Sequence, residues 1–361
     1  MNIGFYRYSL LNRGGDRIVV DYANYLATQG HEVTIHVREF ATRFVINQSV
    51  RCNILNDRNR FIYLLATAGR KFEHDMTVVD IIHLPLLLLF RNKVLYLAQA
   101  DDVEYYSSRI LRAAVDACYR IYFSLGLPTI SVSDHLSKIL QERYHVTQLN
   151  TVNNGIDLEI FHPDPDSELI RSKQGRLAIF FLARGDKYRK GYDIADTIFA
   201  QLPEYLADKA ELWVCGEQFF VNNSRLKVRN FGVVRDEELR RILSSCDIFF
   251  YPSRHEGFGL FPLEAMACGC AVVTSDAVPY SQIHAEILSS PVGNSAQLLG
   301  NLEILLSDLD MLRRCKAAGI VTARSYSNSR SREIFANTLA SVVERRESPV
   351  RTGQDTDEIP S

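Results

Sequence analysis

The chain has 361 residues, of which 47% are hydrophobic and 23% charged, and its formal net charge is −2. That length corresponds to roughly two domains of ~150 residues, and the composition is typical of a globular protein, not of a disordered, fibrous or membrane-spanning one. The near-zero net charge excludes an overall electrostatic field that would attract nucleic acid. The longest apolar run, residues 81–90, covers ten residues, fewer than the ~20 that a membrane-spanning helix needs.

The cysteine pattern and the first residues indicate in which cellular compartment the protein is located. The seven cysteines are scattered without a C-x-x-C pair, which favours reduced thiols over a metal or redox centre. The first residues begin directly with a strand-like pattern and lack the basic and apolar regions of a signal peptide. We therefore expect a cytoplasmic protein.

The beginning of the chain has the pattern of a βαβ unit. Residues 2–8 predict a buried strand, residues 16–28 a helix with one apolar face, and residues 33–37 the next strand. This order implies parallel strands joined by a right-handed crossover. Further strands are expected at residues 78–82, 94–98, 129–132 and 151–153. We assign residues 1–165 to an N-terminal Rossmann-like domain.

The alternation of strands and helices restarts after a polar, proline-containing segment at residues 162–175, which we interpret as a linker. Strands are expected at 177–182, 211–215, 248–251 and 271–274, and helices at 192–200, 236–246 and 263–267. We expect a second Rossmann-like domain over 176–327, a C-terminal helix within 328–346 that crosses back to the first domain, and a disordered tail over 347–361. The predicted fold class is α/β, with two doubly wound domains that face a central cleft where small ligands bind.

Residues 247–269 predict a strand, a glycine-containing loop and a helix that Pro262 opens near its first turn. A phosphate at this helix start would meet unpaired backbone N–H groups, and Gly257 and Gly259 would let the backbone approach it closely. Glu264, expected in the first turn, could accept hydrogen bonds from both hydroxyls of a ribose, while Glu256 faces what lies beyond the phosphates. The alternative is that Glu264 only complements the helix dipole and that the glycines only form a turn.

Arg184 and Lys190 form a second candidate site, because Arg184 ends a predicted strand and Lys190 precedes the next helix. Both cations are expected at the same sheet edge as the loop 256–260. Two fixed cations would neutralise the charge that grows on a diphosphate leaving group as a sugar–phosphate bond breaks. The alternative is a solvated basic loop, since Lys187 and Arg189 lie in the same segment.

Gly14 and Gly15 form a glycine pair between the first predicted strand and the first predicted helix. The pair is not the full G-x-G-x-x-G pattern, so a nicotinamide or flavin cofactor is not favoured. Its backbone amides could still line the cleft from the first domain.

Taken in chain order, these motifs resemble those of the retaining glycosyltransferases of the GT-B fold, family four (glycosyl transferases group 1). These enzymes transfer a sugar from a nucleoside diphosphate sugar (NDP-sugar) to an acceptor. The resemblance covers nearly the whole chain, and its most specific mark is the pair Glu256 and Glu264, with seven residues between them. The other matching positions are Gly14, Gly15, 29–33, 131–133, 153–157, Phe161, Pro163, Arg184 and Lys190.

The resemblance implies specific roles. Arg184 and Lys190 would grip the donor diphosphate, Glu264 would hold the ribose and Glu256 would contact the transferred sugar, so that Arg184, Lys190 and Glu256 are the expected catalytic residues. It also implies retention at the anomeric carbon, with a donor phosphate oxygen helping to accept the acceptor's proton, and polysaccharide biosynthesis on a glycan or lipid-linked acceptor. Neither a cofactor nor a metal is expected. The remaining donor-binding residues would be Gly14, Gly15, Gly257, Phe258, Gly259 and Leu260.

One stretch departs from the family pattern. Many members have a histidine after a strand of the first domain, near the anomeric carbon, and Gln99 stands at the equivalent position here. Because glutamine cannot exchange a proton at neutral pH, we expect Gln99 to act by hydrogen bonding, or Asp101, Asp102 or Glu104 to supply the polar group on the acceptor side. We interpret the nearby His83 as a packed or capping residue.

Asp-x-Asp triplets are the metal-binding pattern of the other main glycosyltransferase fold. They occur here at residues 164–166, 308–310 and 355–357, which lie in the expected linker, a late helix and the tail. We interpret them as solvated carboxylates and predict no metal site.

Residues 38–71 carry a local charge of +5 among several aromatic side chains. Such a segment suits peripheral contact with the inner face of an anionic membrane that bears a lipid-linked acceptor. An acidic glycan or an ordinary surface loop would fit the same charge. The charged residues are Arg38, Arg43, Arg51, Arg58, Arg60, Arg70 and Lys71, against Glu39 and Asp57.

Two further functions stay open. A nucleotide-sugar epimerase of the same fold would act without an acceptor. A non-catalytic partner that binds a nucleotide sugar during polysaccharide assembly would have no need for the missing histidine.

Overall fold

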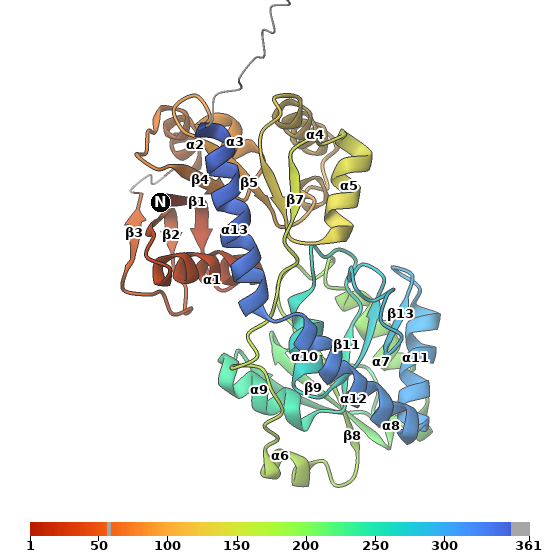
Figure 1. Ribbon diagram of the computed structural model, residues 1–361. Helices are drawn as coiled ribbons and strands as arrows, with labels where there is room; N and C mark the ends of the chain where they lie inside the picture. The colour runs from red at the N-terminus through yellow and green to blue at the C-terminus, as the bar shows by residue number, and fades with distance from the viewer. Residues whose placement is uncertain (56–58, 348–361) are drawn as a thin grey trace, which may run out of the picture.

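The computed structural model describes residues 1–55 and 59–347 and consists of two α/β domains, which confirms the predicted fold class (Figure 1). The first domain holds a seven-stranded sheet in the order β3-β2-β1-β4-β5-β6-β7, with every pair parallel. Its strands are β1 Asn2–Leu10, β2 Glu32–Phe40, β3 Val50–Ile54, β4 Met76–Val79, β5 Val94–Ala98, β6 Thr129–Ser131 and β7 Leu149–Thr151.

The helices of the first domain pack on this sheet. They are α1 Gly14–Thr28, α2 Arg60–Gly69, α3 His83–Leu88, the 3-10 helix η1 Asp102–Tyr105, α4 Arg109–Ser124 and α5 Asp134–Tyr144. In α1 the third residue, Asp16, accepts hydrogen bonds from the backbone N–H of Leu11 and Arg13, which fixes where the helix begins. Ile18, Tyr22 and Leu26 are buried, as the apolar spacing predicts.

The second domain repeats the architecture with a six-stranded parallel sheet in the order β10-β9-β8-β11-β12-β13. Its strands are β8 Leu177–Ala183, β9 Ala210–Gly216, β10 Lys227–Gly232, β11 Ile248–Tyr251, β12 Ala271–Ser275 and β13 Ile287–Ser290. Its helices are α6 Ser167–Ser172, α7 Tyr192–Gln201, α8 Glu204–Ala207, α9 Asp236–Ser245, α10 Leu260–Ala267, α11 Ser295–Ser307 and α12 Leu309–Ser325.

The last helix, α13 Asn328–Glu347, leaves the second domain after α12 and runs beside α1 of the first domain (Figure 1). The Phe335 ring stacks on the Tyr22 ring with centroids 4.0 Å apart, and Phe335 is fully buried. Arg332 pairs with Asp21 of α1. This helix and the segment after β7 make two covalent crossings between the domains.

Several predicted boundaries are wrong, mostly at sheet edges. β3, β10 and β13 were not expected, and β7 lies at Leu149–Thr151 instead of residues 151–153. All four are the outermost strands of their sheets, which have one neighbour only and need no continuous apolar run. The strand expected at 78–82 ends at Val79, because the following apolar residues lead into α3.

Residues 162–175, expected as a linker, contain the short helix α6, whose N-cap Asp166 accepts hydrogen bonds from two backbone N–H groups. Glu347, expected as the first residue of the tail, is the last residue of α13, and residues 348–361 lie outside the described part of the chain. Among the described residues, none of the helices combines the length and the apolar character needed to cross a membrane.

Candidate active site

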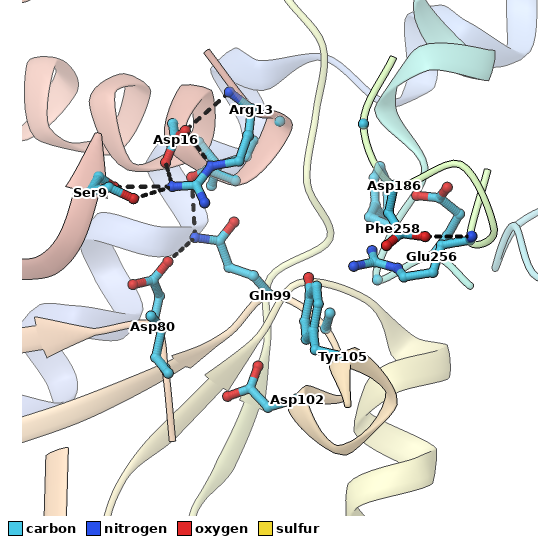
Figure 2. A pocket seen from close by; sticks show the side chains of 18 of the residues that line it. Ser9, Arg13, Asp16, Asp80, Gln99, Asp102, Tyr105, Asp186, Glu256 and Phe258 are labelled. Atoms are coloured by element: carbon cyan, nitrogen blue, oxygen red, sulfur yellow. Dashed lines mark hydrogen bonds and ion pairs between the residues drawn. The ribbon is translucent and has the colours of Figure 1, made fainter. Parts of the chain in front are cut away.

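The carboxyl ends of the two sheets face each other across a cavity of about 530 Å³, within the ~300–1,000 Å³ typical of small-molecule sites. Residues that follow β1, β4 and β5 line it from the first domain, and residues that follow β8 and β11 line it from the second. Figure 2 shows Asp80 and Gln99 on the first-domain side, with Glu256 and Phe258 across from them.

On the second-domain side, Lys190 and Glu256 form a buried ion pair with a separation of 2.6 Å between Nζ and Oε1. Tyr251 and Ser253 donate hydrogen bonds to the same carboxylate oxygen, at 2.8 and 2.6 Å. Burial would raise the pKa of Glu256, but the charge of Lys190 and these hydrogen bonds outweigh it, so that the pKa is lower than that of an ordinary glutamate. Glu256 is therefore ionised and held in one orientation.

Arg184 follows β8 and lines the same cavity as Lys190. Its guanidinium donates a hydrogen bond to the backbone carbonyl of Asn12, in the loop between β1 and α1. Burial, with the like charge of Arg17, lowers the pKa of Arg184 below the usual arginine value. Three of the residues predicted as catalytic thus converge on one cavity, and one of them contacts the opposite domain.

The loop between β11 and α10 contributes Glu256, Gly257, Phe258, Gly259 and Leu260 to the cavity wall. Gly259 has φ 88° and caps α10, a conformation that favours glycine. Gly257 lies so close to the first domain that a Cβ atom there would come within 1.8 Å of the Gln99 backbone oxygen. The predicted glycines are therefore required, one for a turn and one for the contact between domains.

Glu264 lies outside the cavity wall and not in the first turn of α10, which corrects the predicted position. The helix begins at Leu260 because Gly259 caps it, so Glu264 is the fifth helical residue. It is 2% exposed, its Oε1 lies 3.4 Å from Nη1 of Arg17, and its Oε2 has no hydrogen-bond partner among residues 1–55 and 59–347. Burial raises the pKa of Glu264 to about 7 against the opposing charge of Arg17.

Gly14 and Gly15 open α1 and line the cavity from the first domain. Gly14 faces the Leu260 side chain across the cavity, since a Cβ atom at Gly14 would lie 3.6 Å from Leu260 Cδ1. Gln99 and Asp102, both expected on the acceptor side, line the cavity as well.

Asp101, expected with them, is absent from the described cavity wall. Its carboxylate accepts a hydrogen bond from Arg143 at 2.6 Å and caps η1 through the backbone N–H of Val103. The 3-10 turn sends adjacent side chains in different directions, so that Asp102 and not Asp101 reaches the site.

Among the polar residues that sequence reasoning missed, Asp80 and Arg7 line the cavity and Arg17 contacts Glu264. Asp80 directly follows β4 and lines the cavity; a single carboxylate after a buried strand, at the carboxyl end of a parallel sheet, was the available signal. Arg7 lies within β1 and pairs with Asp16 and Asp80. His83, interpreted as a packed residue, also lines the cavity.

Comparisons with known proteins relate the chain to glycosyltransferases. Residues 166–321 match the family model of glycosyl transferases group 1. The serotype-specific mannosyltransferase WbdA of Escherichia coli is 29% identical over 136 residues, which are 37% of this chain and 16% of that protein. The phosphatidyl-myo-inositol mannosyltransferase of Mycobacterium leprae is 28% identical over 213 residues, which are 55% of this chain and 54% of that protein. The chain therefore aligns with about a sixth of the first relative and about half of the second.

A solved structure resembles the whole chain. The Anabaena protein HepE, crystallised in complex with UDP-glucose, superposes with a TM-score of 0.72 at 16% identity and covers 94% of this chain and 100% of its own. The molecule has the GT-B fold of glycosyltransferases. Within that fold, residues 166–321 are the part of the chain that is similar to the glycosyl transferases group 1.

The contact at Gly257 predicts the effect of one substitution. Gly257→Ala should hold the domains apart, because the added methyl group would meet backbone atoms that no side-chain rotation can move. We expect turnover to fall by about a hundredfold, because a misplacement of reacting groups by ~1 Å has an effect of that size. X-ray scattering should show a larger radius of gyration.

Gly300→Ala is the matched control, since a Cβ atom at Gly300 on α11 would have no heavy atom within 4 Å among the described residues. This control should keep full turnover. Full turnover in Gly257→Ala would show that the contact is not needed.

Proposed function

We propose that the protein is a glycosyltransferase that moves a hexosyl group from an NDP-sugar to a glycan or lipid-linked acceptor, with retention of anomeric configuration. The observation that carries the proposal is the convergence of Arg184, Lys190 and Glu256 on one cavity between the domains. Both sequence relatives reported above are mannosyltransferases by name and HepE binds UDP-glucose, which supports a mannosyl or glucosyl donor.

Arg184 and Lys190 would bind the donor diphosphate. As the bond between the anomeric carbon and the phosphate oxygen breaks, negative charge accumulates on the leaving diphosphate, and two preorganised cations stabilise that charge. A phosphate oxygen on the same face would take the proton of the attacking hydroxyl as the new glycosidic bond forms. We propose that these cations stabilise the leaving diphosphate in place of the metal that glycosyltransferases of the other main fold bind.

Glu256 would accept hydrogen bonds from hydroxyls of the transferred sugar. Its Oε1 is saturated by Lys190, Tyr251 and Ser253, so the other oxygen is the one available to a ligand. Because the carboxylate is ionised and fixed, it can orient the sugar without reorganising during the reaction.

Glu264 would hold the ribose hydroxyls. Its Oε2, buried and without a hydrogen-bond partner in the described residues, is the expected acceptor, and Arg17 can keep its contact with Oε1. Glu264 lies one helical turn beyond Leu260 of the cavity wall, so the ribose would extend the donor site past that turn.

The cations predict a kinetic test. Arg184→Ala and Lys190→Ala should each lower kcat/KM by about a hundredfold or more, since each removes a cation from the transition state. The measurement is acceptor-dependent release of nucleoside diphosphate, with the donor chosen by the thermal shift of a nucleotide-sugar panel.

Lys187→Ala is the matched control, because Lys187 lies in the same loop but pairs with Glu217 outside the cavity wall. Unchanged kinetics in the Arg184 and Lys190 variants would disprove the assignment. An epimerised nucleotide sugar formed without acceptor would instead identify an epimerase, and donor binding without turnover would identify a non-catalytic partner.

The pKa of Glu264, about 7, predicts how donor binding depends on pH. The ionised carboxylate accepts from both ribose hydroxyls, whereas the protonated form carries a hydrogen of its own. The dissociation constant of the donor should therefore rise as the pH falls below 7, by up to about tenfold per pH unit. Glu264→Gln should bind the donor more weakly with a flat profile, and a flat profile in the unchanged protein would contradict the role of Glu264.

We also propose cytoplasmic location with peripheral membrane contact through residues 38–71. In the described part of this segment, Ile62 and Leu65 lie one turn apart on α2 with 56% and 77% of their surfaces exposed. Exposed apolar side chains within a basic segment suit an anionic lipid surface.

This contact predicts that the protein co-sediments with vesicles of mixed phosphatidylglycerol and phosphatidylcholine. The double variant Ile62→Glu, Leu65→Glu should lose most of that binding, while Ile283→Glu, an equally exposed site on the second domain, should keep it. Vesicle binding that is absent, or equal in both variants, would refute the contact.

A further inference from the structure

The first-domain end of the cavity presents hydrogen-bond acceptors. Asp80 is 9% exposed and lines the cavity directly after β4. Its Oδ2 is held by Arg7 at 3.0 Å and by the Gln99 side-chain nitrogen at 3.0 Å. Its Oδ1 is buried and finds no hydrogen-bond partner within the described ranges. A buried carboxylate oxygen without a hydrogen-bond partner destabilises the folded protein unless a ligand donates a hydrogen bond to it.

Gln99 has its amide group oriented by the protein. The side-chain nitrogen donates one hydrogen to Asp80 Oδ2 at 3.0 Å and the other to the Gly15 carbonyl at 3.1 Å. Since both partners are acceptors, the nitrogen must face them, and the carbonyl oxygen Oε1 is the group left for a ligand. Gln99 therefore offers an acceptor where a histidine could have offered a donor.

Asp102 adds a second carboxyl group to this wall. Its Oδ2 accepts hydrogen bonds from the Ile82 backbone N–H at 2.8 Å and from the Tyr96 hydroxyl at 3.2 Å, and the residue lines the cavity. Burial and the nearby Asp80 raise the pKa of Asp102 to about 7.

Arg7 and Arg13, which line this end of the cavity, are both paired with carboxylates. Arg7 binds Asp16, Asp80 and the Gly15 carbonyl. Arg13 binds Asp16 and Ser9. Asp16, Asp80 and Asp102 therefore place three carboxyl groups beside the two guanidinium groups of Arg7 and Arg13, and a phosphate here would meet nearby carboxyl groups.

We propose that this end of the cavity is the acceptor subsite and that it selects acceptors by uncharged hydroxyl groups, which donate to Asp80 Oδ1 and Gln99 Oε1, and rejects phosphorylated sugars. Asp80 is a specificity-determining residue in this scheme. The inference rests on the proposed function, because it names the acceptor class of the same site. Its substrate is a neutral glycosyl terminus, whether free or carried on a lipid.

The test compares matched acceptors. With the donor that stabilises the protein most, methyl glycosides of mannose and glucose are offered beside mannose 6-phosphate and glucose 6-phosphate. We expect transfer to the neutral glycosides and at least about tenfold lower kcat/KM for the phosphates. Equal or better use of the phosphates would overturn the proposal.

Asp80→Asn should raise KM for the neutral acceptor about tenfold or more, the loss expected for a hydrogen bond to a charged group, with little change in donor affinity. Gln99→Met, which removes the acceptor oxygen and leaves Asp80 in place, should act in the same direction. Asp75→Asn is the matched control, because Asp75 precedes β4 at the opposite end of the strand and binds the Asn2 backbone.

An unchanged acceptor KM in both site variants would overturn the assignment. If no nucleotide sugar stabilises the protein, the proposed function itself fails. If a donor binds and sugar phosphates are the better acceptors, only the subsite assignment fails.

Discussion

The site depends on how closely the carboxyl ends of the two sheets approach each other. The backbones of Gly257 and Gln99 lie so close that no Cβ atom would fit at Gly257, and Ser133 donates a hydrogen bond to the Gly257 carbonyl at 2.8 Å. The ion pair between Arg17 and Asp236 also joins the domains, but a partly exposed pair of this kind contributes only about 0–1 kcal/mol. Shape at the glycine therefore determines the closed arrangement more than charge does.

That arrangement separates two kinds of chemistry. The second-domain wall supplies cations beside a fixed carboxylate, as the Lys190–Glu256 pair shows, and suits a group that gains negative charge. The first-domain wall supplies hydrogen-bond acceptors, because Arg7 is paired with Asp16 and Asp80 and the side-chain nitrogen of Gln99 donates to Asp80. A reaction in which an anion leaves a sugar carbon while a hydroxyl attacks that carbon would use this asymmetry, and each wall is built on strand ends of one sheet.

Much of this could be predicted from the sequence, since central strands are continuous apolar runs and glycine-rich loops mark where backbones approach. Edge strands such as β10 and β13 were not predicted, because a strand with one neighbour need not be apolar. Asp80 was not predicted as a site residue, because the apolar residues on both sides of it indicated a strand that continues through it. The difference between Asp101 and Asp102 could not be predicted, since it depends on a 3-10 turn and on Arg143, 42 residues away.

In the proposed donor-binding role, Glu264 would connect donor recognition with domain closure. A buried carboxylate is costly without compensation, and its charged neighbour Arg17 comes from the opposite domain and contacts Oε1 only. When the domains separate, Glu264 loses Arg17 but gains water, so opening carries little electrostatic penalty. When they close on a ribose bound as proposed, hydroxyls would satisfy Oε2 while Arg17 keeps Oε1. In the closed state, the cost of burying the Glu264 carboxylate is then fully offset only when the donor is bound. Domain closure therefore depends on the presence of substrate.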